Sequence, residues 1–387
     1  MKSLSLISLL AVLCVSCATT SKSSSTRSQK MQATPMMTLF SMPNSPLVGT
    51  TLSGQKIKMG GFSGLQFSGE KDGALFFQTV TDRGPNGEPE GANRTFLLPE
   101  FSPTVVILKA DLATKEISVV AEIKLKKTDG SPLTGLPNNR NEENPIDVFG
   151  LYYSVDPHGL DIEGLVFDGE GGWWMGEEYG PSLVHFNEEG KMLRRLTPGK
   201  ELPRMYADRK SNRGFEGVAK IENKVFGFMQ SPIPKETSKD GEFSRIVEID
   251  LDSMKTSAEY FYLFEKGNDK IGDAVAVGPK SFLVIEQNGK IGEHSQKYIY
   301  RITLGESDQL VKKTLIADLK NTPFNNLEKI EGIALIDDHR LALVYDNDFQ
   351  ISGKTNHRTG LTPFNDSQNQ LLIMEFTESL KDDSSGL

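Results

Sequence analysis

The sequence has little cysteine and a deficit of positive charge. Two cysteines among 387 residues exclude a disulfide framework and thiolate-rich zinc or iron–sulfur sites. Lysine and arginine number 43 against 52 aspartates and glutamates, a net charge of −9, which argues against a nucleic-acid partner. The acidic excess is compatible with binding of divalent cations, because these prefer carboxylate oxygen.

Several catalytic motifs are also missing. The absence of G-x-S-x-G, H-E-x-x-H and G-x-x-x-x-G-K-S/T excludes serine hydrolases of the α/β type, zincins and P-loop nucleotide hydrolases. The absence of R-H-G-x-R excludes the phosphohistidine intermediate of the histidine acid phosphatases. Any catalytic site must therefore be built from other residues.

The longest apolar run near the N-terminus, Leu4 to Val15, is too short to cross a bilayer and predicts a signal peptide. The next residues, Ser16-Cys17-Ala18, resemble the cleavage box of bacterial lipoproteins. We therefore expect a signal peptide over residues 1–17 and a lipid anchor on Cys17. Ala18 after that cysteine favours the outer membrane of a bacterial cell envelope. A plain secretory signal cleaved nearby is the alternative.

The rest of the chain divides into three parts by composition. Residues 18–44 are rich in serine and threonine and predict a flexible tether. Residues 45–378 contain short β-type runs separated by turn residues, and no stretch has sustained helical periodicity. Residues 379–387 resemble a frayed tail. The folded part is thus predicted to be one all-β domain that contacts the membrane only through the lipid.

A repeat indicates the architecture of this domain. Five strand-entry segments carry paired small or acidic residues: Ser63-Gly64, Glu163-Gly164, Glu216-Gly217, Asp273-Ala274 and Glu331-Gly332. The last four recur at intervals of 53, 57 and 58 residues, whereas the first interval is 100. Repeats of this size are typical of β-propeller blades, and the length of the domain predicts about six, of which five are visible. The long first interval contains a polar insertion, residues 126–156.

In a propeller, Glu163, Glu216, Asp273 and Glu331 would form a ring at one mouth of the central channel. Converging carboxylates repel one another unless a cation lies among them, which predicts a Ca²⁺ site. We expect Glu163, Glu216 and Glu331 to be the ligands. Glu177 and Asp82 would complete the set. The alternative is that each acid caps backbone N–H groups at a blade corner.

Basic residues near the acids suggest an anionic substrate. Arg83 and Arg213 offer the planar fork that suits phosphate or carboxylate, although pairing with acids across the channel is an alternative. His158 lies five residues before Glu163. Glu163, Glu216 and His158 are the candidate catalytic residues.

Five segments together resemble the phytase-like family known as "esterase-like activity of phytase", over roughly residues 45–377. They are Thr81 to Asn86, Asp161 to Leu165, Gly176 to Leu183, Asn212 to Gly217, and Gln230-Ser231-Pro232. One departure is Asp161-Ile162-Glu163, where the family more often has Asp-Pro-Glu. The resemblance implies a secreted or envelope-anchored β-propeller, and the family name points to hydrolysis of phosphate or other esters.

These observations lead to one expected function and two alternatives. We expect a monomeric hydrolase of small anionic phosphate esters, in which a bound Ca²⁺ assists attack by water. A Ca²⁺-dependent lactonase or carboxyl-ester hydrolase is one alternative. A non-catalytic binding propeller of the cell envelope is the other.

Overall fold

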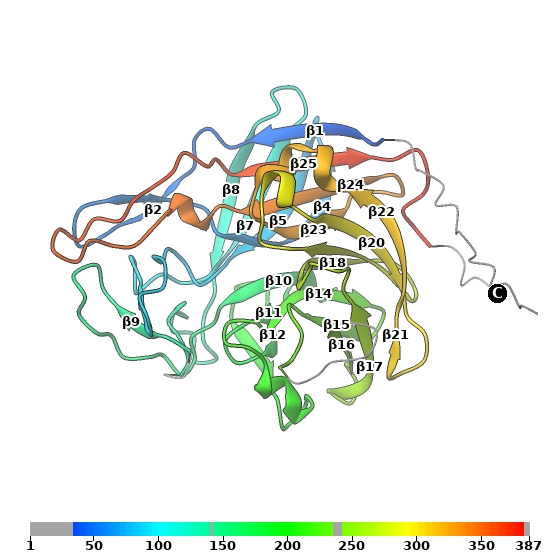
Figure 1. Cartoon of the computed structure of the whole chain (residues 1–387), viewed down its shortest axis with the longest axis horizontal. Helices are drawn as coiled ribbons and strands as arrows, with labels where there is room; N and C mark the ends of the chain where they lie inside the picture. Colours follow the sequence, from blue (N-terminus) through cyan, green and yellow to red (C-terminus); the bar gives the residue numbers. More distant parts are fainter. Residues whose placement is uncertain (1–33, 140–141, 235–241, 383–387) are drawn as a thin grey trace, which may run out of the picture. The chain divides into compact units, whose positions relative to one another are not determined.

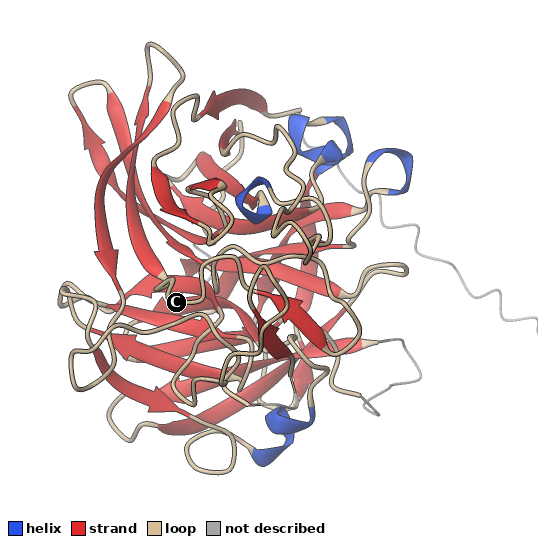
Figure 2. Ribbon diagram, turned by 90° about the vertical axis from the view of Figure 1, so that its left-hand side faces the viewer, coloured by secondary structure: helices blue, strands red, loops and turns tan. Residues whose placement is uncertain are grey.

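The computed structural model describes residues 34–139, 142–234 and 242–382. The expected signal peptide, Cys17 and most of the tether lie outside these residues. The regular secondary structure of the described residues is almost entirely strand, joined by loops and a few short 3-10 helices (Figure 2). Many strands are rich in β-branched residues, such as Thr104–Asp111. None of its helices is long and apolar enough to cross a membrane. The prediction of an all-β fold is confirmed.

Five antiparallel sheets of four main strands form the blades. The first blade consists of β4 (Phe62–Lys71), β5 (Ala74–Thr81), β7 (Thr104–Asp111) and β8 (Ile117–Lys124). The second consists of β10 (Ile162–Phe167), β11 (Trp173–Glu177), β12 (Ser182–Phe186) and β13 (Met192–Leu196). The third consists of β14 (Phe215–Ile221), β15 (Lys224–Met229), β16 (Phe243–Asp250), β17 (Lys255–Leu263) and the short β21 (Gln309–Leu310).

The fourth blade consists of β18 (Lys270–Gly278), β19 (Ser281–Gln287), β20 (Lys297–Thr303) and β22 (Lys312–Asp318). The fifth consists of β23 (Lys329–Leu335), β24 (Arg340–Asp346), β25 (Gln370–Glu375) and β1 (Met36–Ser41). The short strands β2 (Leu47–Thr50) and β3 (Lys56–Lys58) form one small sheet, and β6 (Asn93–Thr95) and β9 (Asn144–Ile146) form another. The short 3-10 helices are η1 (Arg204–Asp208), η2 (Gly292–His294), η3 (Leu319–Asn321), η4 (Pro323–Asn326) and η5 (Asp348–Gln350).

The first strands of the blades close a ring. Strand β4 contacts β10, β10 contacts β14, β14 contacts β18, β18 contacts β23, and β23 contacts β4. The fold is therefore a five-bladed propeller, and the predicted count of about six is corrected to five. The 100-residue interval holds one blade and the insertion, whose residues contribute β9 rather than a further blade.

The hydrophobic core lies between the blades. Five clusters of buried residues each join two neighbouring sheets, as where Phe62 of the first blade meets Val344 of the fifth. Alternation along β11 sends Trp173 to the cluster shared with the first blade and Trp174 to the cluster shared with the third. Both rings are buried and belong to the core.

The folded domain extends further toward both ends of the chain than the composition suggests. Residues 36–41, expected in the flexible tether, form β1, which pairs along its length with β25 (Figure 1, blue beside red). Phe40 on this strand is fully buried. In the expected tail, Leu380 is buried and Asp382 accepts a hydrogen bond from Ser281 Oγ at 2.5 Å. The folded domain therefore includes residues 36–44 and 379–382, beyond the predicted bounds of 45–378.

Candidate functional site

A β-bulge near the start of each blade's first strand positions the acids. The register slips between Ile162 and Gly164, between Phe215 and Gly217, and between Ile330 and Gly332. The residue left unpaired in each slip is a glutamate: Glu163, Glu216 and Glu331. A bulge re-aims the side chain of its extra residue, so these three glutamates leave the regular alternation of their strands.

The fourth blade departs from this arrangement. Its slip lies between Ile271 and Asp273, so the residue at the glutamate position is Gly272. A Cβ at Gly272 would lie 2.1 Å from the carbonyl oxygen of Ile330, which leaves no space for a side chain. Asp273 is one residue further along. It accepts hydrogen bonds from the backbone N–H groups of Ala274 at 2.7 Å and Ile333 at 2.9 Å. The expected ring of four acids is thus corrected to three, and Asp273 has the structural role.

Glu163, Glu216 and Glu331 converge as the sequence predicts. One carboxylate oxygen from each lies within 4.8 Å of the other two, and all three side chains are buried. Because Ca²⁺–oxygen distances are about 2.3–2.6 Å, oxygens on opposite sides of one ion lie about 5 Å apart, so this spacing suits a single ion. The glutamine Gln230 donates to Glu216 Oε2 at 2.7 Å, and Ser63 Oγ lies 3.4 Å from Glu331 Oε2.

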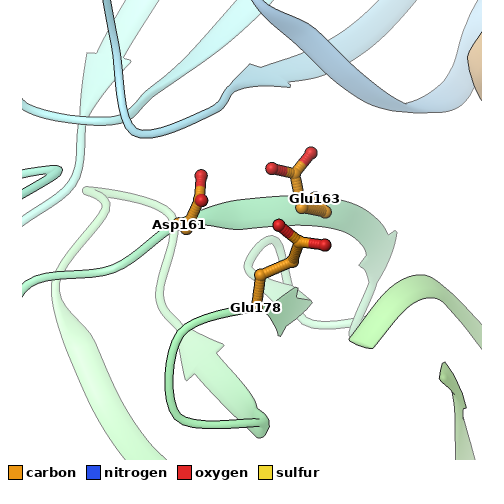
Figure 3. A group of neighbouring side chains, drawn as sticks. All are labelled: Asp161, Glu163 and Glu178. Carbon is orange, nitrogen blue, oxygen red and sulfur yellow. The ribbon is translucent and has the colours of Figure 1, made fainter. Parts of the chain in front are cut away.

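A second triad lies beside the first and shares Glu163. Asp161, Glu163 and Glu178 bring one oxygen each within 4.8 Å of one another. Asp161 and Glu163 extend from the start of β10, and the carboxylate of Glu178 reaches toward them from the end of β11 (Figure 3). Asp161 and Glu178 are almost fully buried, at 1% and 2% exposure. The described residues thus hold two overlapping groups of carboxylates that could bind a metal ion.

Glu177 faces away from this cluster. Its carboxylate accepts hydrogen bonds from the backbone N–H groups of Tyr179 and Gly180, from Ser182 Oγ at 3.0 Å and from Arg195 at 2.9 Å. Neighbouring residues of a strand point to opposite faces, so only one of the pair Glu177-Glu178 can reach the channel. Glu177, expected among the metal ligands, therefore lies outside both triads, and its neighbour Glu178 lies in the second one.

Burial and mutual repulsion hold the acids toward their protonated forms. Burial, followed by the charges of Asp161, Glu216 and Glu331, raises the pKa of Glu163 well above its usual value. Burial and the charge of Asp161 raise the pKa of Glu178 to about 8. The pKa of Glu216 is also well raised by burial, with Glu178 and Glu331 contributing. A bound cation would reverse this effect by stabilising the ionised carboxylates.

Arg83 and Arg213 both lie near the acids but differ in availability. Arg83 is buried, and its Nη1 donates to Glu143 at 3.1 Å, Tyr179 Oη at 3.3 Å and Asn212 Oδ1 at 3.2 Å. This is the internal pairing that the sequence left open. Arg213 is one-third exposed, donates to its neighbour's carbonyl oxygen and lies 4.0 Å from Glu178 Oε1. Arg213 is therefore the arginine with room for an external anion.

Two other expected residues lie outside the triads. Asp82 follows the second strand of its blade, as Glu178 does, but accepts from the backbone N–H of Gly84 at 2.7 Å. Burial and the charges of Asp346 and Asp161 raise its pKa well above the usual value. His158 is exposed, lies two residues after the insertion, and belongs to neither triad. The structure therefore does not bring His158 into either triad, and its catalytic role stays a prediction.

The site residues predicted from the sequence do not include Asp161 and Glu178 of the second triad, nor Asp346 and Lys329. Lys329 bridges Asp346 and Asp348, with Nζ 2.6 Å from Asp348 Oδ1. Asp346 ends the second strand of its blade, and Glu178 directly follows the corresponding strand. Comparing the residues at the end of the second strand in all five blades could therefore have identified Glu178 and Asp346.

The part of the chain that contains both triads is similar to a known protein family. The family model described as "Esterase-like activity of phytase" matches residues 57–349, which include every member of both triads. The chain belongs to this phytase-like family. An uncharacterized secreted protein of Arthroderma benhamiae is 30% identical over 127 residues, 29% of this chain and 24% of that protein. The chain thus matches about a quarter of the length of that curated relative.

Solved structures give only distant likenesses. The catalytic domain of the Coprinopsis cinerea GH62 α-L-arabinofuranosidase is 10% identical with a TM-score of 0.42, over 89% of this chain and 98% of that one. A putative glycosidase from Bacteroides thetaiotaomicron is 11% identical with a TM-score of 0.42, over 87% and 93%. The assignment of a propeller rests on the strand order and the closed ring of first strands.

Proposed function

We propose that this phytase-like propeller is a Ca²⁺-dependent hydrolase of small phosphate esters. The observation that carries the proposal is the convergence of Glu163, Glu216 and Glu331 at one buried point. Glu163 supports it further, because its side chain is largely buried and the described residues give it no hydrogen bond or ion pair. A buried carboxylate without a partner is costly, and a cation would supply one.

The three glutamates would hold the ion, and Gln230 fixes the orientation of Glu216 through its hydrogen bond at 2.7 Å. When bound, Ca²⁺ supplies positive charge that offsets phosphate charge and lowers the pKa of bound water. Arg213, one-third exposed beside Glu178, would bind phosphate oxygens. Arg83, held by Glu143 and Tyr179, would keep that side of the site in place.

The test is hydrolysis by the purified full chain. We expect turnover of p-nitrophenyl phosphate or phytate with Ca²⁺, and loss of turnover when a chelator removes the ion. Glu216→Gln should abolish activity, whereas Glu188→Gln, which alters an exposed acid, should leave it unchanged. Absence of turnover on phosphate esters with and without metal would contradict the proposal.

The family description favours a second candidate, a carboxyl-ester hydrolase or lactonase, because it names an esterase-like activity. The same ion would polarise an ester carbonyl. A panel of p-nitrophenyl acetate and lactones, run beside the phosphate esters, separates the two activities. A non-catalytic binding propeller would instead show no turnover on either panel and no thermal shift with Ca²⁺.

We also propose that the protein acts as a monomer outside the cytoplasm, anchored to the outer membrane by a lipid on Cys17. The support is the sequence Ser16-Cys17-Ala18 after a short apolar run. Replacement of the cysteine by alanine should move the protein from the membrane fraction to the soluble fraction of the cell. Unchanged fractionation would contradict the anchor.

A further inference from the structure

We infer that the channel mouth binds two divalent cations, with Glu163 as the ligand shared between them. This inference rests on the metal site of the proposed function and adds a second ion held by Asp161, Glu163 and Glu178. The arrangement that points to it is two carboxylate triads with one common member.

Unsatisfied polar atoms support the second site independently of the acidic cluster itself. Asp161 Oδ2 and Glu178 Oε1 are buried and have no hydrogen-bond partner in the part of the chain that the structure describes. Their nearest cationic groups are distant for hydrogen bonds, with Arg83 Nε 3.6 Å from Asp161 Oδ2 and Arg213 Nη1 4.0 Å from Glu178 Oε1. Buried carboxylate oxygens are normally bonded, so these atoms call for a ligand.

The shared residue gives the strongest indication. Glu163 is 93% buried and unpartnered among the described residues, yet it lies within 4.8 Å of ligand atoms in both triads. A carboxylate has two oxygens, each of which can accept a separate ligand. Glu163 can therefore offer one oxygen to each ion, whereas Asp161 and Glu178 belong to one site only. Glu216 and Glu331 belong to the other.

Charge also favours two ions over one. The two triads contain five different carboxylates. With all five ionised, as metal binding requires, one divalent cation would balance two of these charges and two cations would balance four. Arg83 is divided between Glu143 and Asp161, and Lys329 pairs with Asp346 and Asp348. Arg213, one-third exposed, lies 4.0 Å from Glu178 Oε1 and supplies at most one further positive charge. A buried excess of charge is costly, so the second ion is the expected counter-charge.

Two ions at this position would suit phosphoryl chemistry. In two-metal sites the ions lie about 3.5–4 Å apart and stabilise both the attacking and the leaving oxygen of an in-line displacement. Arg213 borders the second triad, close to Glu178, and is the exposed cation of the site. The substrate class would accordingly be a phosphate monoester whose phosphate bridges the two ions and contacts this arginine.

The test counts ions directly and needs no substrate. The full chain, stripped of metal, is titrated with Ca²⁺ by isothermal titration calorimetry. We expect two equivalents for the native chain and for the exposed control Glu188→Gln. Asp161→Asn and Glu331→Gln should each retain one equivalent, from opposite sites. Glu163→Gln should weaken both sites at least about tenfold, because loss of even an outer-shell partner weakens metal binding by about 10–100-fold.

Mn²⁺ provides a second measurement that does not depend on any variant folding. Two Mn²⁺ ions that share a carboxylate give an exchange-coupled electron paramagnetic resonance spectrum, whereas isolated ions give six-line spectra. We expect coupling at two equivalents. A single equivalent of Ca²⁺, or two uncoupled Mn²⁺ ions, overturns the shared site and leaves the proposed single-ion hydrolase standing. No binding of either metal overturns both.

Discussion

At the scale of single residues, the ionisation of Glu178 and its neighbours governs how the site responds to pH. The raised pKa values mean that the folded, metal-free protein keeps protons that the unfolded chain releases. Between the unfolded pKa of a glutamate, 4.5, and the folded value of about 8 for Glu178, the native state therefore binds more protons. Stability must then fall as pH rises through this window.

The first prediction follows from this decrease in stability with rising pH. In the presence of a chelator, the melting temperature should be several degrees lower at pH 8 than at pH 5, since a shift of this size is worth on the order of a few kcal/mol. Acids whose pKa is lowered, such as Asp156 and Asp168, titrate below this window and do not oppose the trend. Added Ca²⁺ should raise the melting temperature more at pH 8 than at pH 5. Differential scanning fluorimetry measures both, and a metal-free protein that is equally stable at both pH values would refute the argument.

Asp273 provides the contrast, because it is the fourth acid of the sequence repeat but lies one residue beyond the glutamate position and has a structural role. Asp273→Ala leaves the N–H groups of Ala274 and Ile333 without their acceptor. Each unsatisfied buried donor costs about 1–3 kcal/mol, so for the two donors we expect a loss of about 2–6 kcal/mol in the free energy of unfolding. Urea denaturation measures the loss, and Ca²⁺ stoichiometry should not change. Stability equal to that of the native chain would show that these bonds are not needed.

At the scale of elements, the β-bulge decides which side chain reaches the channel. It places Glu163, Glu216 and Glu331 inward, whereas in β18 the same position is Gly272. There the missing side chain lets Gln287 bond to both backbone groups of Ile330, at 2.9 and 3.0 Å. In the fourth blade, the side-chain amide of Gln287 thus joins β19 to β23 at the place where the second, third and fifth blades have a glutamate.

The bulge glycine can be tested by adding one methyl group. Gly272→Ala places a Cβ 2.1 Å from the Ile330 carbonyl oxygen and 2.8 Å from Gln287 Nε2, so we expect a loss of about 1–3 kcal/mol or more in stability. Gly305→Ala is the matched control, because its Cβ meets nothing closer than 3.6 Å. It should stay within about 0.5 kcal/mol of the native chain in the same denaturation experiment. Equal effects of the two substitutions would contradict this account of the bulge.

The sequence predicts the elements better than it predicts which way individual side chains point. The hydrophobic runs and their spacing correctly indicate the blades and bring Glu163, Glu216 and Glu331 together. The shift of Asp273 by one residue escapes prediction because a bulge changes register without changing composition. The sequence does not show whether Glu177 or Glu178 reaches the cluster for a similar reason. The side that each side chain faces depends on where β11 ends, and composition does not determine that residue.

At the scale of the whole molecule, the last blade joins the two ends of the chain. Strand β1 comes from the N-terminal side and pairs with β25, whose residues 370–375 lie more than 300 positions later. Composition could not reveal this pairing, because six residues beside a serine-rich segment give little signal of a partner so remote. The blade count was obscured in a similar way by the insertion between the first two blades.

A substitution on β1 tests whether this closure contributes to stability. Phe40→Ala should cost about 3–5 kcal/mol, because the ring is fully buried between the first and fifth blades. Met36→Ala on the same strand is the control, since this side chain is 68% exposed and should have little effect. Chemical denaturation with the two variants side by side is the measurement. If the Phe40→Ala protein is as stable as the control, β1 does not contribute to stability and residues 36–41 act as part of the tether.

The pairing of β1 with β25 also constrains the order in which the protein is made and folded. Until residues 370–375 have been synthesised, β1 has no partner and the fifth blade lacks a strand. Closing a loop that spans nearly the whole domain carries an entropic cost and slows folding relative to the local hairpins of the other blades. Ring closure should accordingly be the late, rate-limiting event. A nascent chain released before its last twenty residues would carry four complete blades and an unpaired strand edge, a target for proteolysis and aggregation.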